Sequence, residues 1–128
     1  MTLSWQTILA VGCGGFLGAI ARVYLNFTIT KMLPHEFPFG ILAVNVLGSF
    51  LIGVLFAIFI HYNINESLKS FLSAGFLGAL TTYSTFAIES FFLLQTSFLL
   101  GVSNMALNLF GTILAAGSGY KLIFYFMK

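Results

Sequence analysis

Residues 75–86 read Gly-Phe-Leu-Gly-Ala-Leu-Thr-Thr-Tyr-Ser-Thr-Phe, which is the most informative stretch of the chain. It lies in the middle of a long apolar segment, and its two glycines are followed by four hydroxyl side chains: Thr81, Thr82, Ser84 and Thr85. Such residues make a poor continuous helix. At membrane depth, backbone groups freed by a break must meet protein, water or an ion. The stretch favours a helix broken mid-membrane; an intact helix whose hydroxyls bond back to earlier carbonyls is the alternative.

The chain around this stretch divides into four apolar segments, each long enough for a membrane-spanning helix, which needs about 20 residues. The segments are expected at residues 4–29, 39–60, 67–94 and 98–127, with a polar link around 31–38. Short links make consecutive helices alternate in direction, which predicts an up-down bundle with both termini on one side. We therefore expect residues 1–128 to form a single all-α transmembrane domain.

The composition agrees with a membrane protein. Of the 128 residues, 59% are hydrophobic and only 6% are charged, whereas a soluble domain carries about 25% charged residues. The lipid bilayer is therefore the expected neighbour of most of the surface. The few cations are too scattered for a nucleic-acid partner, which needs a basic face. The sequence also has no nucleophile–base pair and no phosphate-binding glycine loop, so we do not expect an enzyme.

The orientation in the membrane is not decided by the charges. Lys and Arg near the ends of membrane helices normally stay cytoplasmic. Lys69, Lys121 and Lys128 fall on the side of the termini, while Lys31 and the nearby Arg22 fall on the other. This bias is almost nil. Either a weak preference selects one orientation, or copies insert both ways and pair antiparallel, which is called dual topology.

Three polar side chains stand out in the first three apolar segments. A cation at membrane depth costs about 2.5–3.5 kcal/mol, so Arg22 should face a water-filled vestibule that attracts anions, or snorkel to an interface. Asn45 offers an uncharged amide, suited to an ion path or to a bond between helices. Glu89 follows the predicted break by two helical turns. It could support the structure by pairing with Arg22 or another donor, or it could line a path.

The fourth segment carries Asn104, Asn108 and Thr112 at spacings of four residues, which places them on one helical face. These side chains could donate hydrogen bonds to a partly dehydrated anion, or they could form hydrogen bonds that hold helices together. We favour the first role, because few polar partners for the second are evident in the sequence. Tyr83 and Phe86 follow the predicted break directly. The positive edge of an aromatic ring can meet an anion without a full charge.

Three motifs together carry a family resemblance: GGFLGAIAR at 14–22, FGILAVNVLGSFLIG at 39–53 and GFLGALTTYSTFAIE at 75–89. With these motifs in this order, the chain resembles the small bacterial fluoride channels, the Fluc family, from the first segment to the fourth. The resemblance implies passive fluoride efflux across the bacterial cytoplasmic membrane, and so resistance to fluoride. It also implies a multi-pass, dual-topology antiparallel homodimer with two pores, and it thus favours the second of the two orientations above.

The resemblance further implies a structural sodium ion on the two-fold axis, held by main-chain carbonyls of Gly78 and Thr81 from both subunits. Ala79 stands between them where many members have glycine.

The resemblance also assigns the fluoride path. Asn45 would line the pore, and Phe86 would be one of two rings that contact fluoride. The other ring falls at Tyr83, where the family usually has phenylalanine. Asn104, Asn108 and Thr112 would form the polar track of the fourth helix, and we assign the hydroxyls of Ser84 and Thr85 to the same pathway.

Two other functions compete with this one. A small dual-topology multidrug exporter is also a four-helix antiparallel dimer, but it uses a carboxylate in its first helix, where this chain has Arg22. A non-transporting assembly subunit of a larger membrane complex would explain the glycines, but it would leave the polar face of the fourth helix without a purpose.

Overall fold

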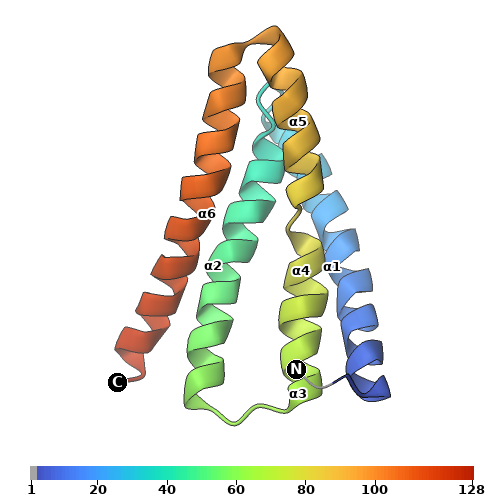
Figure 1. Ribbon diagram of the computed structural model, residues 1–128, viewed down its shortest axis with the longest axis vertical. Coiled ribbons are helices and arrows are strands. Elements are labelled where there is room, and N and C mark those ends of the chain that lie inside the picture. The colour runs from blue at the N-terminus through green and yellow to red at the C-terminus, as the bar shows by residue number, and fades with distance from the viewer. Residues whose placement is uncertain (1–2) are drawn as a thin grey trace.

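A computed structural model describes residues 3–128, and in this range it consists of helices and short links (Figure 1). Four stretches are long and apolar enough to cross a membrane: Trp5–Met32, Phe39–His61, Glu66–Thr96 and Phe98–Phe126. The first, second and fourth are the single helices α1, α2 and α6. The prediction of an all-α protein with four transmembrane helices is confirmed.

The third stretch is built from several pieces. It begins with α3 at Glu66–Ser70, continues as the π-helix η1 at Phe71–Leu77 and ends its first half with α4 at Gly78–Leu80. Its second half is α5, Tyr83–Thr96. A π-helix inside a membrane span had no counterpart among the sequence predictions.

Two helix ends differ from the expected ranges for local reasons. α1 continues past Ile29 to Met32 and so includes Lys31, which the sequence placed in the link. The helix ends before Leu33 because a residue that precedes a proline disfavours the α conformation. Only Ser97 separates α5 from α6, and its hydroxyl accepts a hydrogen bond from the Leu100 N–H at 3.3 Å. This cap lets α6 begin without a longer turn.

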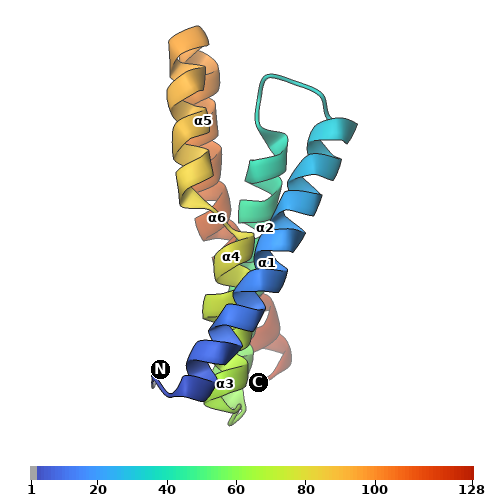
Figure 2. The same cartoon turned by 90° about the vertical axis from the view of Figure 1, so that its right-hand side faces the viewer.

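The four spans run alternately up and down, and the start of α1 and the end of α6 lie at the same end of the molecule (Figure 1). α2 packs along α6, and α1 packs along η1 and α4. Figure 2 shows that the spans diverge toward the end opposite the termini, with α5 and α6 on one side and α1 and α2 on the other. The split begins at the level where α4 gives way to α5.

Glycines allow the closest helix contacts. A Cβ atom on Gly18 of α1 would overlap the carbonyl oxygen of Phe76 in η1. Across the α2–α6 contact, a Cβ on Gly53 would overlap the carbonyl oxygen of Ala116. Small residues let membrane helices approach until their backbones touch, and this packing replaces the hydrophobic effect that is absent in lipid.

The outer faces of the helices carry large apolar side chains. Phe16 of α1, Phe56 of α2 and Phe110 of α6 are each more than half exposed. A soluble protein rarely exposes apolar surface on this scale, whereas lipid covers it without cost. The chain is therefore a multi-pass membrane protein.

Gly18→Ala should destabilise the protein, because the added methyl group enters the backbone of η1. Overpacking of this kind costs about 1–3 kcal/mol. Gly12→Ala is the matched control, since no atom of residues 3–128 lies within 4 Å of a Cβ at that position of α1. Thermal melting of both purified variants in detergent should show a clear loss for Gly18→Ala and no loss for Gly12→Ala. Equal melting temperatures would contradict the close contact.

Candidate functional site

The main chain leaves the helical conformation between α4 and α5. Thr81 (φ −85°, ψ 154°) and Thr82 (φ −145°, ψ 126°) are both extended. The Thr82 hydroxyl accepts a hydrogen bond from the Thr85 N–H at 3.2 Å and so caps the start of α5. The Thr81 hydroxyl donates to the Leu77 carbonyl at 3.0 Å. A hydroxyl bond to the carbonyl four residues earlier is what the intact-helix alternative predicted, but here the helix ends directly before Thr81.

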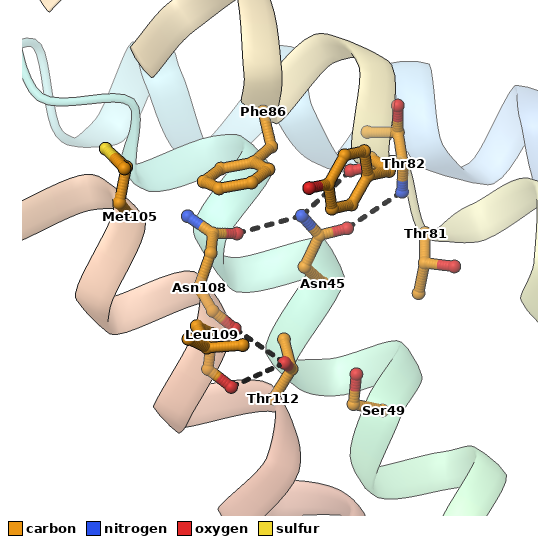
Figure 3. A pocket seen from close by; sticks show the side chains of 10 residues that line it. Asn45, Ser49, Thr81, Thr82, Phe86, Met105, Asn108, Leu109 and Thr112 are labelled. Atoms are coloured by element: carbon orange, nitrogen blue, oxygen red, sulfur yellow. Dashed lines mark hydrogen bonds between the residues drawn. The ribbon is translucent and has the colours of Figure 1, made fainter. Parts of the chain in front are cut away.

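The side chain of Asn45 in α2 binds both backbone groups of Thr82 (Figure 3). The Thr82 N–H donates to Asn45 Oδ1 at 2.8 Å, and Asn45 Nδ2 donates to the Thr82 carbonyl at 3.0 Å. Extended residues within a span lose their helical partners, and a buried unpaired backbone group costs about 1–3 kcal/mol. One amide side chain therefore replaces two backbone hydrogen bonds at the interruption.

Asn45 also connects the interruption to α6. Its Nδ2 donates to Asn108 Oδ1 at 2.9 Å, and Asn108 Nδ2 lies 3.0 Å from both the carbonyl oxygen and Oδ1 of Asn104. Asn104 Nδ2 in turn donates to the Ser90 hydroxyl of α5 at 2.9 Å. The polar face of α6 therefore has hydrogen-bond partners on neighbouring helices, namely Asn45 of α2 and Ser90 of α5. The Thr112 hydroxyl bonds to carbonyls of its own helix, those of Asn108 and Leu109.

A cavity of about 380 Å³ opens beside this network. Its lining contains hydroxyls, amides, aromatic rings and apolar side chains, and none of the lining residues is charged: Asn45, Ser49, Thr81, Thr82, Tyr83, Phe86, Met105, Asn108, Leu109 and Thr112. The Tyr83 and Phe86 rings pack edge to face, with centroids 5.4 Å apart. Tyr83 is 81% exposed, so this ring projects from the protomer.

The structure brings some predicted site residues together and leaves others aside. Asn45, Tyr83, Phe86, Asn108 and Thr112 line the one cavity. Three others are absent from its lining. Ser84 is exposed, the Thr85 hydroxyl bonds to the Thr82 hydroxyl at 3.1 Å, and Asn104 is buried between α5 and α6.

Arg22 contacts the first half of the third span. Its Nε donates to the Ala79 carbonyl at 3.0 Å. This carbonyl has no helical partner, because the helix ends at Leu80 before the chain can supply one. A cation at the C-terminal end of a helix is also favoured by the helix dipole. The guanidinium therefore stabilises the end of the helical half, a contact that the sequence did not indicate.

Glu89 lies apart from Arg22. It lines a second cavity, of about 430 Å³, together with Glu36, Pro38, Phe92, Leu93 and Thr96. Within residues 3–128, Glu89 forms no ion pair with Arg22. Of the alternatives that the sequence left for Glu89, pairing with Arg22 is not found.

The carbonyls of Gly78 and Thr81 lie at the interruption. Across the described range 3–128, neither oxygen receives a hydrogen bond. Gly78 is exposed on the protomer, and Thr81 is partly exposed. The N–H of Thr82, which would serve Gly78 in a continuous helix, donates to Asn45 instead. Both carbonyls are therefore free to bind a donor or a cation.

Sequence reasoning missed Ser90, which is buried and bonded to Asn104. A signal was present, because Thr82, Phe86 and Ser90 are spaced by four residues and share a helical face. No side-chain pattern marks the Ala79 carbonyl, so the Arg22 contact could not be found in the same way.

The chain matches known proteins over nearly its whole length. Residues 9–120 match the family described as CrcB-like protein, Camphor Resistance (CrcB). A relative from Sulfurimonas denitrificans, named fluoride-specific ion channel FluC, is 55% identical over 94% of this chain and 95% of its own length. Relatives with the same name from Nautilia profundicola and Campylobacter jejuni are 42% and 47% identical, over 93% and 90% of this chain and 94% and 95% of their own lengths. The chain resembles these proteins as its three motifs predict, and it belongs to the CrcB family.

Proposed function

We propose that this protein is a fluoride-specific channel that lets fluoride leave the cell passively across the bacterial cytoplasmic membrane and thereby protects against fluoride. The relatives' shared name supports the substrate. The observation that carries the proposal is the uncharged cavity that the Asn45 and Asn108 amides and the Phe86 ring line together.

Neutral groups suit this task physically. A small anion that leaves water needs hydrogen-bond donors, and conduction requires binding weak enough for release. Hydroxyls and ring edges satisfy both conditions, whereas a fixed cation would hold the anion. In this proposal Asn45, Asn108 and Thr112 form the polar wall of the path, and Phe86 and Tyr83 form the aromatic wall. The Asn45 and Asn108 amides bond to one another and to their neighbours, and so they hold the polar wall in place.

The proposed active unit is an antiparallel homodimer. Tyr83 projects from the protomer and Gly78 is exposed at mid-span, so both are available to a second copy. The nearly balanced Lys and Arg distribution allows insertion in both directions. A two-fold axis at the interruption would bring the third spans of two copies together.

We also propose a structural sodium ion on that axis. The support is the pair of carbonyls at Gly78 and Thr81 that receive no hydrogen bond within residues 3–128. Two copies would supply four such oxygens, and an unpaired polar group in a dry interior costs roughly 2–7 kcal/mol. A bound cation would neutralise these oxygens, as carbonyls of unwound helices do for ions in transporters. The ion would hold the dimer together and would not be transported.

Fluoride efflux from liposomes that contain only this purified protein should proceed without a pH gradient and without ATP, while chloride is retained. Among the described residues, no acid lines the cavity beside Asn45 and Asn108, and this argues against coupling to protons. Efflux of organic cations would favour the exporter alternative, and absence of any flux would favour an assembly subunit. A requirement for a pH gradient would contradict passive transport.

Asn45→Asp should slow fluoride efflux severely. A carboxylate can still accept from the Thr82 N–H, but it cannot donate to the Thr82 carbonyl or to Asn108. Each buried group left unsatisfied costs about 1–3 kcal/mol, and a negative charge would repel the anion. The control is Asn63→Asp, in the exposed link between α2 and α3, which should match the wild type. Normal efflux through Asn45→Asp with the aspartate ionised would show that Asn45 is not part of the path.

Gly78→Val should prevent dimer formation, and Thr81→Ala should be mild because it keeps the main-chain carbonyl. Among residues 3–128 of the protomer, a Cβ at Gly78 meets only the Ser73 carbonyl, at 3.4 Å. A loss of dimer should therefore result from a clash at the dimer axis, and the helix content of the protomer should stay unchanged. Size-exclusion chromatography with circular dichroism tests this in sodium buffers. An intact Gly78→Val dimer would contradict the proposed ion site.

A further inference from the structure

The orientation of the Asn45 amide is determined by the main chain of Thr82. A backbone N–H can only donate and a carbonyl can only accept. Asn45 must therefore turn Oδ1 toward the Thr82 N–H and Nδ2 toward the Thr82 carbonyl, as their separations of 2.8 and 3.0 Å indicate. If the amide were flipped, Nδ2 would face the Thr82 N–H and Oδ1 would face the Thr82 carbonyl, so that two donors and two acceptors would meet.

The orientation of Asn45 in turn determines the orientations of the Asn108 and Asn104 amides. The second N–H of Asn45 donates to Asn108 Oδ1, so Asn108 turns Nδ2 toward Asn104. Asn104 Oδ1 accepts there, which leaves Asn104 Nδ2 to donate to Ser90. Apart from the Asn45 N–H that donates back to the Thr82 carbonyl, each donor in this series points from the helix interruption toward Ser90. Ser90 is thus the terminal acceptor of a directed chain of hydrogen bonds, which we call the amide chain: Thr82, Asn45, Asn108, Asn104 and Ser90.

The side chains of the amide chain are buried, although Asn45 and Asn108 border the cavity. Its four side chains are 7% (Asn45), 5% (Asn108), 1% (Asn104) and 5% (Ser90) exposed. Water cannot readily replace a lost partner at such sites, and buried polar networks lose most of their value when one member is unsatisfied. Removal of the terminal hydroxyl would therefore leave the Asn104 amide without its acceptor, and Asn108, which bonds to Asn104, would lose a fixed partner.

The amide chain holds α5 at two points on either side of the Phe86 ring. Thr82 precedes Phe86 by four residues and Ser90 follows it by four, so one helical turn separates the ring from each contact. Figure 3 shows the Phe86 ring beside the Asn108 amide. The height and rotation of the ring relative to that amide depend on both contacts.

We propose that Ser90 is a positioning residue for the ion path, acting through Asn104 and Asn108 to fix where α5 presents the Phe86 ring. The inference rests on the proposed fluoride channel. Ser90 itself does not line the cavity, and its effect on fluoride is indirect. Such a residue should change the rate through each channel, whereas a purely structural contact would change only the number of channels that assemble.

Single-channel recording of fluoride currents separates these two effects. Ser90→Ala should lower the unitary current about tenfold, equivalent to about 1.4 kcal/mol. Ser90→Thr restores the accepting hydroxyl and should stay within about twofold of the wild type. Ser118→Ala, at an exposed serine of α6 outside the amide chain, is the matched control and should leave the current unchanged.

A normal unitary current in Ser90→Ala, even with fewer channels, would overturn the positioning role. An equally low current in Ser90→Thr would overturn it too. If Ser90→Ala does not assemble, Ser90→Cys serves in its place: sulfur is a weak acceptor, so a current reduced about threefold is expected, and an unchanged current would refute the role. Absence of fluoride current in the wild type would instead refute the proposed function.

Discussion

The structure depends on one constraint, the pair of hydrogen bonds between the Asn45 side chain and the main chain of Thr82. A membrane helix cannot stop in mid-span unless its freed backbone groups find partners. Asn45 supplies a donor and an acceptor from a neighbouring helix, and Arg22 supplies a donor to the Ala79 carbonyl on the other side of the interruption. With these contacts in place, two extended residues are compatible with the interior of a membrane protein.

The helix packing makes this arrangement possible. Glycines bring α1 against η1 and α2 against α6 with backbone contact. Arg22 of α1 and Asn45 of α2 both bond to the main chain at the interruption. The spans then diverge at the end opposite the termini (Figure 2), and the cavity lined by Asn45 and Asn108 lies beside the interruption. Close packing in one half and separation in the other thus follow from where the glycines lie and where the third span changes direction.

Much of the fold could be predicted from the sequence, because hydrophobicity and length define the four spans. The polar face of α6 was also evident from its four-residue spacing. The partners of that face were not, since Ser90 lies on a different span and its pairing with Asn104 depends on how α5 packs on α6. The role of Arg22 at Ala79 could not be foreseen either, because its partner is a main-chain oxygen. The interruption itself falls at Thr81 and Thr82, inside the stretch whose hydroxyl residues drew attention to it.

An experimental structure of the protein in a lipid bilayer would test the helix interruption most directly, through the backbone conformation of residues 78–86. We predict extended conformations at Thr81 and Thr82, with both polar atoms of the Asn45 amide within hydrogen-bond distance of the Thr82 main chain. A continuous helix through residues 78–86, with the Asn45 amide turned elsewhere, would contradict the account.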